Sequence, residues 1–156
     1  MSKKITWLLP LSLAAGTIFA WYTIWNDFQR FYLNEGTVFK INDCISPNPV
    51  TTPCFYGGIA FIIALIWSII LVRKSSEQFH SGLKKLLWLL VASTLFAWGN
   101  FSYEVITFLN RGAKPAIGCS GQLVTNPIYT PCFVGAAIFL LCLIIAIIFY
   151  KKSGRK

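Results

Sequence analysis

Four long apolar segments without a single charged residue constrain this chain more than any other feature. They are Ile5–Trp25, Phe55–Val72, Leu86–Tyr103 and Phe133–Tyr150. At about 1.5 Å of helical rise per residue, about 20 apolar residues cross the roughly 30 Å hydrocarbon core of a bilayer. Helices of a soluble core would carry polar residues at helical spacing, and these segments carry almost none. We therefore predict an all-α integral membrane protein, a bundle of four transmembrane helices.

The basic residues indicate the orientation of the bundle. Most of the 14 Lys and Arg residues lie on one side of the segments: Lys3, Lys4, Arg73, Lys74, Lys84, Lys85, Lys151, Lys152, Arg155 and Lys156. An excess of Lys and Arg marks the cytoplasmic side, so both termini are predicted to be cytoplasmic in a multi-pass protein of the plasma (cell inner) membrane. Because this charge lies beside helix ends, orientation and anionic lipid headgroups explain it. We expect the lipid bilayer, and no nucleic acid, as its partner.

The chain contains an internal repeat. Asn48–Gly57 matches Asn126–Gly135 at seven of ten positions, and Phe19-Ala-Trp21 matches Phe96-Ala-Trp98. The matches keep their order, which indicates a tandem duplication of a helical hairpin. Because Phe-Ala-Trp recurs deep in the chain, we interpret the first apolar segment as a retained helix and not a cleaved signal peptide.

Each copy is expected to cross outwards, form an outer loop and return, so that both hairpins share one orientation. The first repeat spans residues 1–78, with helices at 5–25 and 55–72 and an outer loop at 26–54. The second spans 79–156, with helices at 86–103 and 133–150 and an outer loop at 104–132. Helical sequence continues into each loop as far as Gly36 and Gly112, where left-handed residues are expected to end the helices. The link 73–85 is expected to be an ordinary connector.

Disulfide staples are the simplest interpretation of the cysteines. Four of the five lie in the predicted outer loops, namely Cys44, Cys54, Cys119 and Cys132. An oxidising compartment favours disulfides, and Cys44–Cys54 with Cys119–Cys132 is the simplest of three possible pairings, among which the sequence does not choose. Closing loops of about ten to thirteen residues would contribute roughly 2–3 kcal/mol. The fifth, Cys142, lies within a predicted helix and is expected to be a small buried hydrophobe.

Redox activity is the alternative interpretation. Each outer loop ends in Thr-Pro-Cys-Phe, which is typical of a helix start with Thr as N-cap and Pro at N1. Cys54 and Cys132 would then stand at N2, where unpaired N–H groups and the helix dipole stabilise a thiolate, the attacking species in disulfide exchange. Cys44 and Cys119 would be their resolving partners.

Four helices, cytoplasmic termini and one cysteine pair in each outer loop resemble the disulfide-bond-formation protein B and vitamin K epoxide reductase group. The resemblance implies oxidation of a soluble extracytoplasmic thiol protein at the expense of a quinone. It also implies that Cys54 lies nearest the quinone with Cys44 as its partner, and that Cys119 and Cys132 form the shuttle pair. Spacings of ten and thirteen residues replace the Cys-x-x-Cys motif of that group.

Two acids are related by the repeat. Asp27 and Glu104 each follow the tryptophan of a Phe-Ala-Trp by six residues. Ionisable groups at membrane depth often relay protons or line a path, a role that would suit a small transporter or channel subunit. The interpretation we favour is that they lie just outside the hydrocarbon, hydrated or paired with Arg30 and Arg111.

The sequence lacks the residues that several other classes of protein require. The single histidine, His80, supplies neither a pair of haem ligands nor a metal cluster nor a Ser-His-Asp triad, and we expect no metal. The sequence thus favours a structural, assembly or partner-binding membrane protein with stapled outer loops, either alone or as a homo-oligomer. A quinone-linked thiol oxidoreductase and a transporter remain the alternatives.

Overall fold

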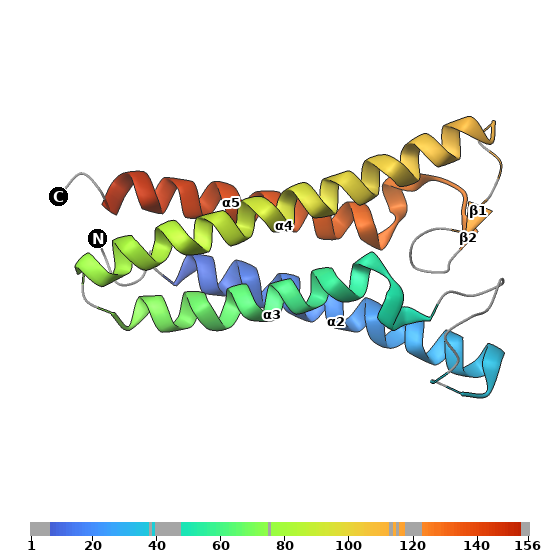
Figure 1. Ribbon diagram of the computed structural model, residues 1–156, viewed down its shortest axis with the longest axis horizontal. Coiled ribbons are helices and arrows are strands. Elements are labelled where there is room, and N and C mark those ends of the chain that lie inside the picture. The colour runs from blue at the N-terminus through green and yellow to red at the C-terminus, as the bar shows by residue number, and fades with distance from the viewer. Residues whose placement is uncertain are drawn as a thin grey trace.

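The structure is a computed structural model that describes residues 7–37, 39, 48–74, 76–112, 114, 116–117 and 123–153. Within these residues the long helices are α2 (Leu8–Glu35), α3 (Pro53–Val72), α4 (Ser76–Asn110) and α5 (Pro131–Ser153), and they form one bundle (Figure 1). All 4 are long and apolar enough to cross a membrane. The prediction of an all-α, multi-pass membrane protein built from four helices is confirmed.

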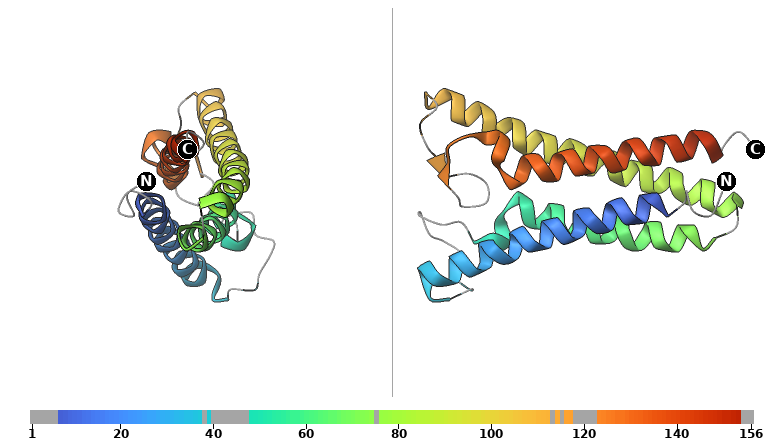
Figure 2. Two further views of the ribbon diagram at one scale, coloured as in Figure 1. Left: turned by 90° about the vertical axis from the view of Figure 1, so that its left-hand side faces the viewer. Right: turned by 180° about the vertical axis from the view of Figure 1, so that it is seen from behind.

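The helices are arranged as two hairpins that lie side by side. α2 packs against α3 and α4 against α5, and the hairpins meet through contacts of α3 with α4 and of α2 with α5. The start of α2, the α3–α4 turn and the end of α5 lie at one end of the bundle, here called the turn end (Figures 1 and 2). The starts of α3 and α5 lie towards the opposite end, the loop end, where the hairpins diverge. The cysteine-bearing starts of two helices therefore face the same end.

Two helices extend beyond their apolar segments in the direction of the loop end. α2 continues to Glu35, and Gly36 follows it with φ of 67° and donates its N–H to the Tyr32 carbonyl. Gly112 follows α4 with φ of 68° and donates its N–H to the Leu109 carbonyl at 3.0 Å. Both glycines adopt the left-handed conformation that the sequence predicts, because a residue without Cβ enters it at little cost.

The prediction of a connector at 73–85 is wrong over most of its length, because α4 begins at Ser76. The reason is packing. Leu83 is fully buried in the core, and Gly82 lets α4 approach the side chain of Leu71 on α3. The His80 ring stacks on Tyr150 of α5, with ring centroids 4.5 Å apart. Because this segment is helical, it packs against both α3 and α5.

The loop end also contains short elements. The 3-10 turns η1 (Pro49–Thr51) and η2 (Pro127–Tyr129) precede α3 and α5, and β1 (Ala116–Ile117) pairs antiparallel with β2 (Leu123–Val124). The sequence analysis predicted no strands there. Cys44 and Cys119 lie outside the described residues, and so do the predicted pairings Cys44–Cys54 and Cys119–Cys132.

The bundle core contains one close aromatic stack between the diagonal helices α3 and α5. Phe61 and Phe139 lie with ring centroids 3.7 Å apart and an interplanar angle of 11°. Gly16 of α2 makes room for this stack, because a Cβ there would lie 2.5 Å from Phe61 Cε1. Cys142 is fully buried, so its predicted role as a small core residue is confirmed.

Candidate functional site

The two helices that return from the loop end begin in the same way. Pro53 is the first residue of α3 and Cys54 the second, and Pro131 and Cys132 take the same places in α5. Proline fits the first helical position because its missing N–H would be unpaired there in any case. The predicted placement of both cysteines at N2 is confirmed.

The turns before these helices hold their shape by equivalent hydrogen bonds. The Asn48 Oδ1 accepts from the Val50 N–H at 3.1 Å, and the Asn126 Oδ1 accepts from the Ile128 N–H at 3.1 Å. Thr52 stands at the N-cap position of α3, but its side chain makes no cap hydrogen bond. Its hydroxyl instead donates to the Pro49 carbonyl at 2.6 Å. Thr52 therefore occupies the predicted N-cap position, but its hydroxyl does not cap α3 as predicted, because it donates to a carbonyl of the 3-10 turn.

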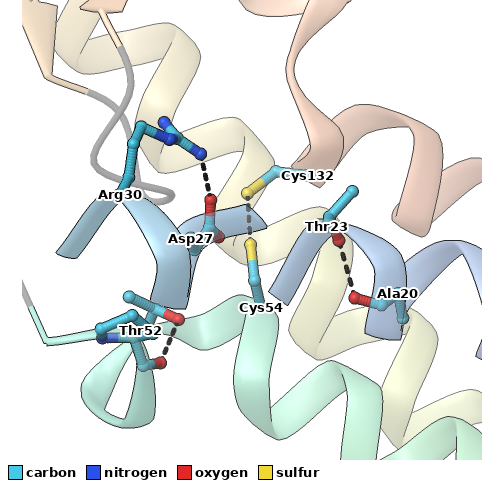
Figure 3. A network of polar contacts seen from close by, with 8 residues as sticks. Ala20, Thr23, Asp27, Arg30, Thr52, Cys54 and Cys132 are labelled. Atoms are coloured by element: carbon cyan, nitrogen blue, oxygen red, sulfur yellow. Dashed lines mark hydrogen bonds and ion pairs between the residues drawn. The ribbon is translucent and has the colours of Figure 1, made fainter. Parts of the chain in front are cut away.

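The cysteines at these two helix starts meet between the hairpins. The Sγ atoms of Cys54 and Cys132 are 3.3 Å apart, although the residues are 78 positions apart in the chain (Figure 3). A disulfide bond measures about 2.05 Å, so the two sulfurs are in contact without being bonded to each other. Cys54 is half-buried. Partners within each loop were the simplest of the three pairings that the sequence leaves open, and the structure instead brings Cys54 and Cys132 of different hairpins into contact.

The two acids that the sequence repeat relates lie close to the sulfur pair, in different surroundings. Asp27 is 5% exposed, and its Oδ1 accepts from the Arg30 Nη2 at 2.5 Å (Figure 3). The expected pairing of Asp27 with Arg30 is thus confirmed. The Oε2 of Glu104 accepts from the Thr130 hydroxyl at 3.3 Å. Both carboxyl groups interact electrostatically with the Cys54 thiol.

Aromatic rings surround the sulfur pair in both hairpins. Trp21 of α2 meets Phe55, the residue after Cys54, edge to face at 6.2 Å. Trp98 of α4 meets Phe133, the residue after Cys132, edge to face at 6.4 Å. The tryptophan of each Phe-Ala-Trp motif therefore packs against the phenylalanine that follows a cysteine, a role that was not predicted from the sequence.

Both cysteines line a cavity of about 50 Å³ in the centre of the bundle. Its remaining walls are formed by equivalent residues of the two repeats, namely Phe19 and Phe96, Ala20 and Ala97, Thr23 and Asn100, Pro53 and Pro131, Gly57 and Gly135, Gly58 and Ala136, and Phe61 and Phe139. The Thr23 hydroxyl and the Asn100 amide donate to carbonyls of their own helices, each at 2.7 Å. The cavity is consequently almost apolar next to the sulfurs.

A second, larger space adjoins this cavity between α3 and α4. It measures about 350 Å³ and shares Gly57, Phe96 and Phe139 with the central cavity. Its other lining residues are Tyr56, Ala60, Ala92 and Ser93. We call this space the α3–α4 groove. Among the described residues, no three His, Cys, Asp or Glu side chains are placed to hold a metal ion.

Fold and site together define a class: a multi-pass membrane protein of four helices in which two cysteines from different hairpins meet over an apolar cavity. The comparisons with known proteins add no family to this description. No protein-family model matches the chain, and no curated protein or solved structure shows significant similarity to it.

Proposed function

We propose that this protein is a membrane thiol–disulfide oxidoreductase in which electrons pass between the two hairpins through Cys54 and Cys132. The observation that carries the proposal is the 3.3 Å separation of their Sγ atoms. Reacting atoms in near-attack geometry are about 3–3.5 Å apart. Exchange between the loops requires sulfurs of different hairpins to come this close.

The proposed step is a disulfide exchange. The Cys54 thiolate attacks Cys132 while Cys132 is bonded to a third cysteine, for which Cys119 is the candidate. The Cys54–Cys132 bond forms, the earlier S–S bond breaks, and the displaced sulfur leaves as a thiolate that takes up a proton. Cys44 is the candidate that then attacks Cys54 and frees Cys132. Two electrons thereby move from one loop to the other, and the reverse sequence moves them back.

The α3–α4 groove, which adjoins the cavity that the sulfurs line, is large enough for a membrane electron acceptor. The α3–α4 groove, at about 350 Å³, lies within the range of small-molecule sites, roughly 300–1,000 Å³. Tyr56, Phe96 and Phe139 give it aromatic walls, and Phe96 and Phe139 also border the central cavity. A quinone, when bound, supplies a two-electron, two-proton acceptor. The role of the chain would be to hold that ring against the cavity wall that the cysteines form.

Orientation, ancestry and family belong to the same proposal. The basic residues of the α3–α4 turn and of the end of α5 support a cytoplasmic turn end and a loop end on the outer face, where a soluble thiol partner would dock. The matching helix starts and the paired cavity walls support a tandem duplication of the hairpin. Cysteines at the loop end of four helices support a relationship to the disulfide-bond-formation protein B and vitamin K epoxide reductase group.

Trapping the exchange intermediate tests the proposal. The full chain is prepared in lipid vesicles, treated with oxidised glutathione, quenched in acid, alkylated and mapped by peptide mass spectrometry. We expect a Cys54–Cys132 cross-linked peptide to appear and then to decay. Cys54→Ser should abolish it, and Cys142→Ala, at a buried cysteine away from the pair, should leave it unchanged.

The stapled structural protein and the transporter are the other outcomes of this experiment. Disulfides that stay within each loop and resist mild reductant, with no cross-link between the hairpins at any time, would refute thiol exchange and return the cysteines to a structural role. In that case transport would gain support only if substitutions of Asp27 and Glu104 had larger effects on cells than any cysteine substitution.

A further inference from the structure

We infer that Ser93 anchors a lipid-soluble ligand in the α3–α4 groove, by donating a hydrogen bond from its hydroxyl to an oxygen of that ligand. The ligand class is a flat, apolar molecule that carries a carbonyl oxygen. The inference rests on the proposed function, because the quinone proposed there is a molecule of this class. It also goes beyond it, since an electron acceptor in the groove does not by itself name the residue that holds it.

The first support is that the buried Ser93 hydroxyl has no partner of its own. The other buried serine and threonine side chains each donate to a backbone carbonyl three or four residues earlier, namely Thr52, Ser68, Thr94 and Thr130. Ser93 is 9% exposed, and its hydroxyl makes no hydrogen bond within the part of the chain that the structure describes. Burying an unpaired hydroxyl is costly, so this one points to a partner outside the chain.

The second support is the place of Ser93 in the α3–α4 groove. Ser93 and Phe139 are the buried residues that line the groove, whereas Tyr56 and Phe96 are 55% and 45% exposed. The groove therefore extends from the surface of the bundle to a buried floor that contains the hydroxyl. The surface of a membrane-spanning helix faces lipid or protein. A ligand consequently enters from the bilayer, which selects apolar molecules, and meets a hydrogen-bond donor at the floor.

The position of Ser93 also sets the direction in which an anchored ligand extends. Ser93 precedes Phe96 by three residues on α4, which places it about one helical turn nearer the turn end. Phe96 and Gly57 line both the groove and the central cavity, and Cys54 and Cys132 line that cavity. A ring held at Ser93 by its oxygen therefore extends past Phe96 towards the cavity that the sulfurs line.

The other polar side chains near this space are less suited to hold the ligand. The Thr23 hydroxyl and the Asn100 amide line the central cavity, and each already donates to a carbonyl of its own helix. Tyr56 lines the groove but is more than half exposed. Ser93 is therefore the buried donor in the groove.

Binding of two matched ligands tests the inference. The first is a dimethylated naphthoquinone, and the second is the corresponding dimethylnaphthalene, which has the same ring system and no oxygen. The full chain is treated with oxidised glutathione, so that it does not reduce the quinone, and is purified in detergent. Saturable binding of the radiolabelled quinone gives its Kd, and displacement of the bound quinone gives the Kd of the hydrocarbon.

Ser93→Ala should discriminate between the two ligands. We expect it to weaken binding of the quinone about 3- to 10-fold, the loss that corresponds to one neutral hydrogen bond. Binding of the hydrocarbon should change less than about 2-fold, because it has no oxygen to accept that bond. Without ligand, the variant should melt at or above the temperature of the unaltered chain, since it removes a buried hydroxyl that lacks a partner.

Ser68→Ala and Ala92→Leu are the control variants. Ser68 is 1% exposed, its hydroxyl donates to the Leu65 carbonyl at 2.8 Å, and it lines neither the groove nor the central cavity. Its replacement should change the binding of both ligands less than about 2-fold. Ala92→Leu fills the groove and should weaken the binding of both ligands, which would locate the site there.

Failure of the inference and failure of the proposed function give different results. The inference is overturned if Ser93→Ala binds the quinone as tightly as the unaltered chain does, or if it weakens both ligands alike. Absence of saturable quinone binding to the unaltered chain overturns it as well. Thiol exchange stands in all these cases as long as the Cys54–Cys132 cross-link forms. If no cross-link forms, the proposed function fails, and quinone binding that depends on Ser93 would still establish the anchor.

Discussion

Replacing Gly16 by alanine is expected to destabilise the bundle by forcing apart the aromatic stack under the sulfur pair. A Cβ at this position would lie 2.5 Å from Phe61 Cε1 and 2.9 Å from Ile138 Cγ2. Real Cβ atoms do not approach other atoms so closely, so a neighbour must move. Phe61 cannot yield easily, because it is 1% exposed and its ring stacks on Phe139 at 3.7 Å.

The size of the stability change caused by Gly16→Ala follows from two opposing effects. Overpacking a filled core costs about 1–3 kcal/mol, and exchanging glycine for alanine inside a helix returns roughly 0.5–1 kcal/mol. Gly99→Ala is the matched control, because a Cβ at Gly99 of α4 would meet nothing within 4 Å. Both variants share the helix gain, so the difference between their stabilities isolates the steric cost, about 1–3 kcal/mol.

Thermal unfolding of the two full-length variants in the same detergent measures this difference. For a chain of this size, 1 kcal/mol corresponds to about 2–4 °C in Tm. We therefore expect Gly16→Ala to melt about 2–12 °C below Gly99→Ala, and Gly99→Ala to melt at or slightly above the unaltered chain. Equal melting temperatures for the two variants would refute the close contact between α2 and the Phe61–Phe139 stack.

Three further predictions follow from the site. Asp27→Asn should lower the stability by about 1–3 kcal/mol, because it removes the charged, buried acceptor of the ion pair with Arg30, and chemical unfolding measures the change. Asn48→Ala and Asn126→Ala should each cost about 0.5–2 kcal/mol in the same assay, because each removes the acceptor of a hydrogen bond in a 3-10 turn, and an unchanged stability of either variant would argue against that contact. Ala92→Leu, which fills the α3–α4 groove, should slow reduction of a short-chain quinone without slowing Cys54–Cys132 cross-linking. If the variant and the unaltered chain reduce the quinone at the same rate, the groove does not bind the quinone.

Much of the scaffold follows from local patterns in the sequence. Uncharged apolar segments give four spanning helices because the bilayer sets their length. Gly36 and Gly112 end helices where the chain needs a left-handed residue, and both do so with φ close to 67°. Pro53 and Pro131 set the helix starts and thereby the N2 positions of the cysteines. These features depend on a few neighbouring residues, which is why they can be predicted.

The reactive pairing could not be predicted in this way. The spacing within each loop favours local partners for Cys54 and Cys132. No pattern in the sequence shows which helices lie diagonally opposite each other in a bundle. The Thr130–Glu104 hydrogen bond likewise joins residues 26 positions apart in the chain. α4 begins early because Leu83 is buried and Gly82 packs against α3. The residues around them in the sequence are polar, and for that reason the segment was predicted to be a connector.

The proposed duplication gives a physical reason why the two sulfurs meet. Two hairpins related by an axis through the bundle bring equivalent residues to that axis, so a cysteine near it must face its own counterpart. Symmetry alone would make the two sulfurs chemically equal, and an exchange needs one to attack and the other to accept. The surroundings of the two acids differ between the repeats: Asp27 is paired with Arg30, and Glu104 accepts a hydrogen bond from Thr130. Duplication would thus create the contact, and divergence of the residues around it would be needed to give the exchange a direction.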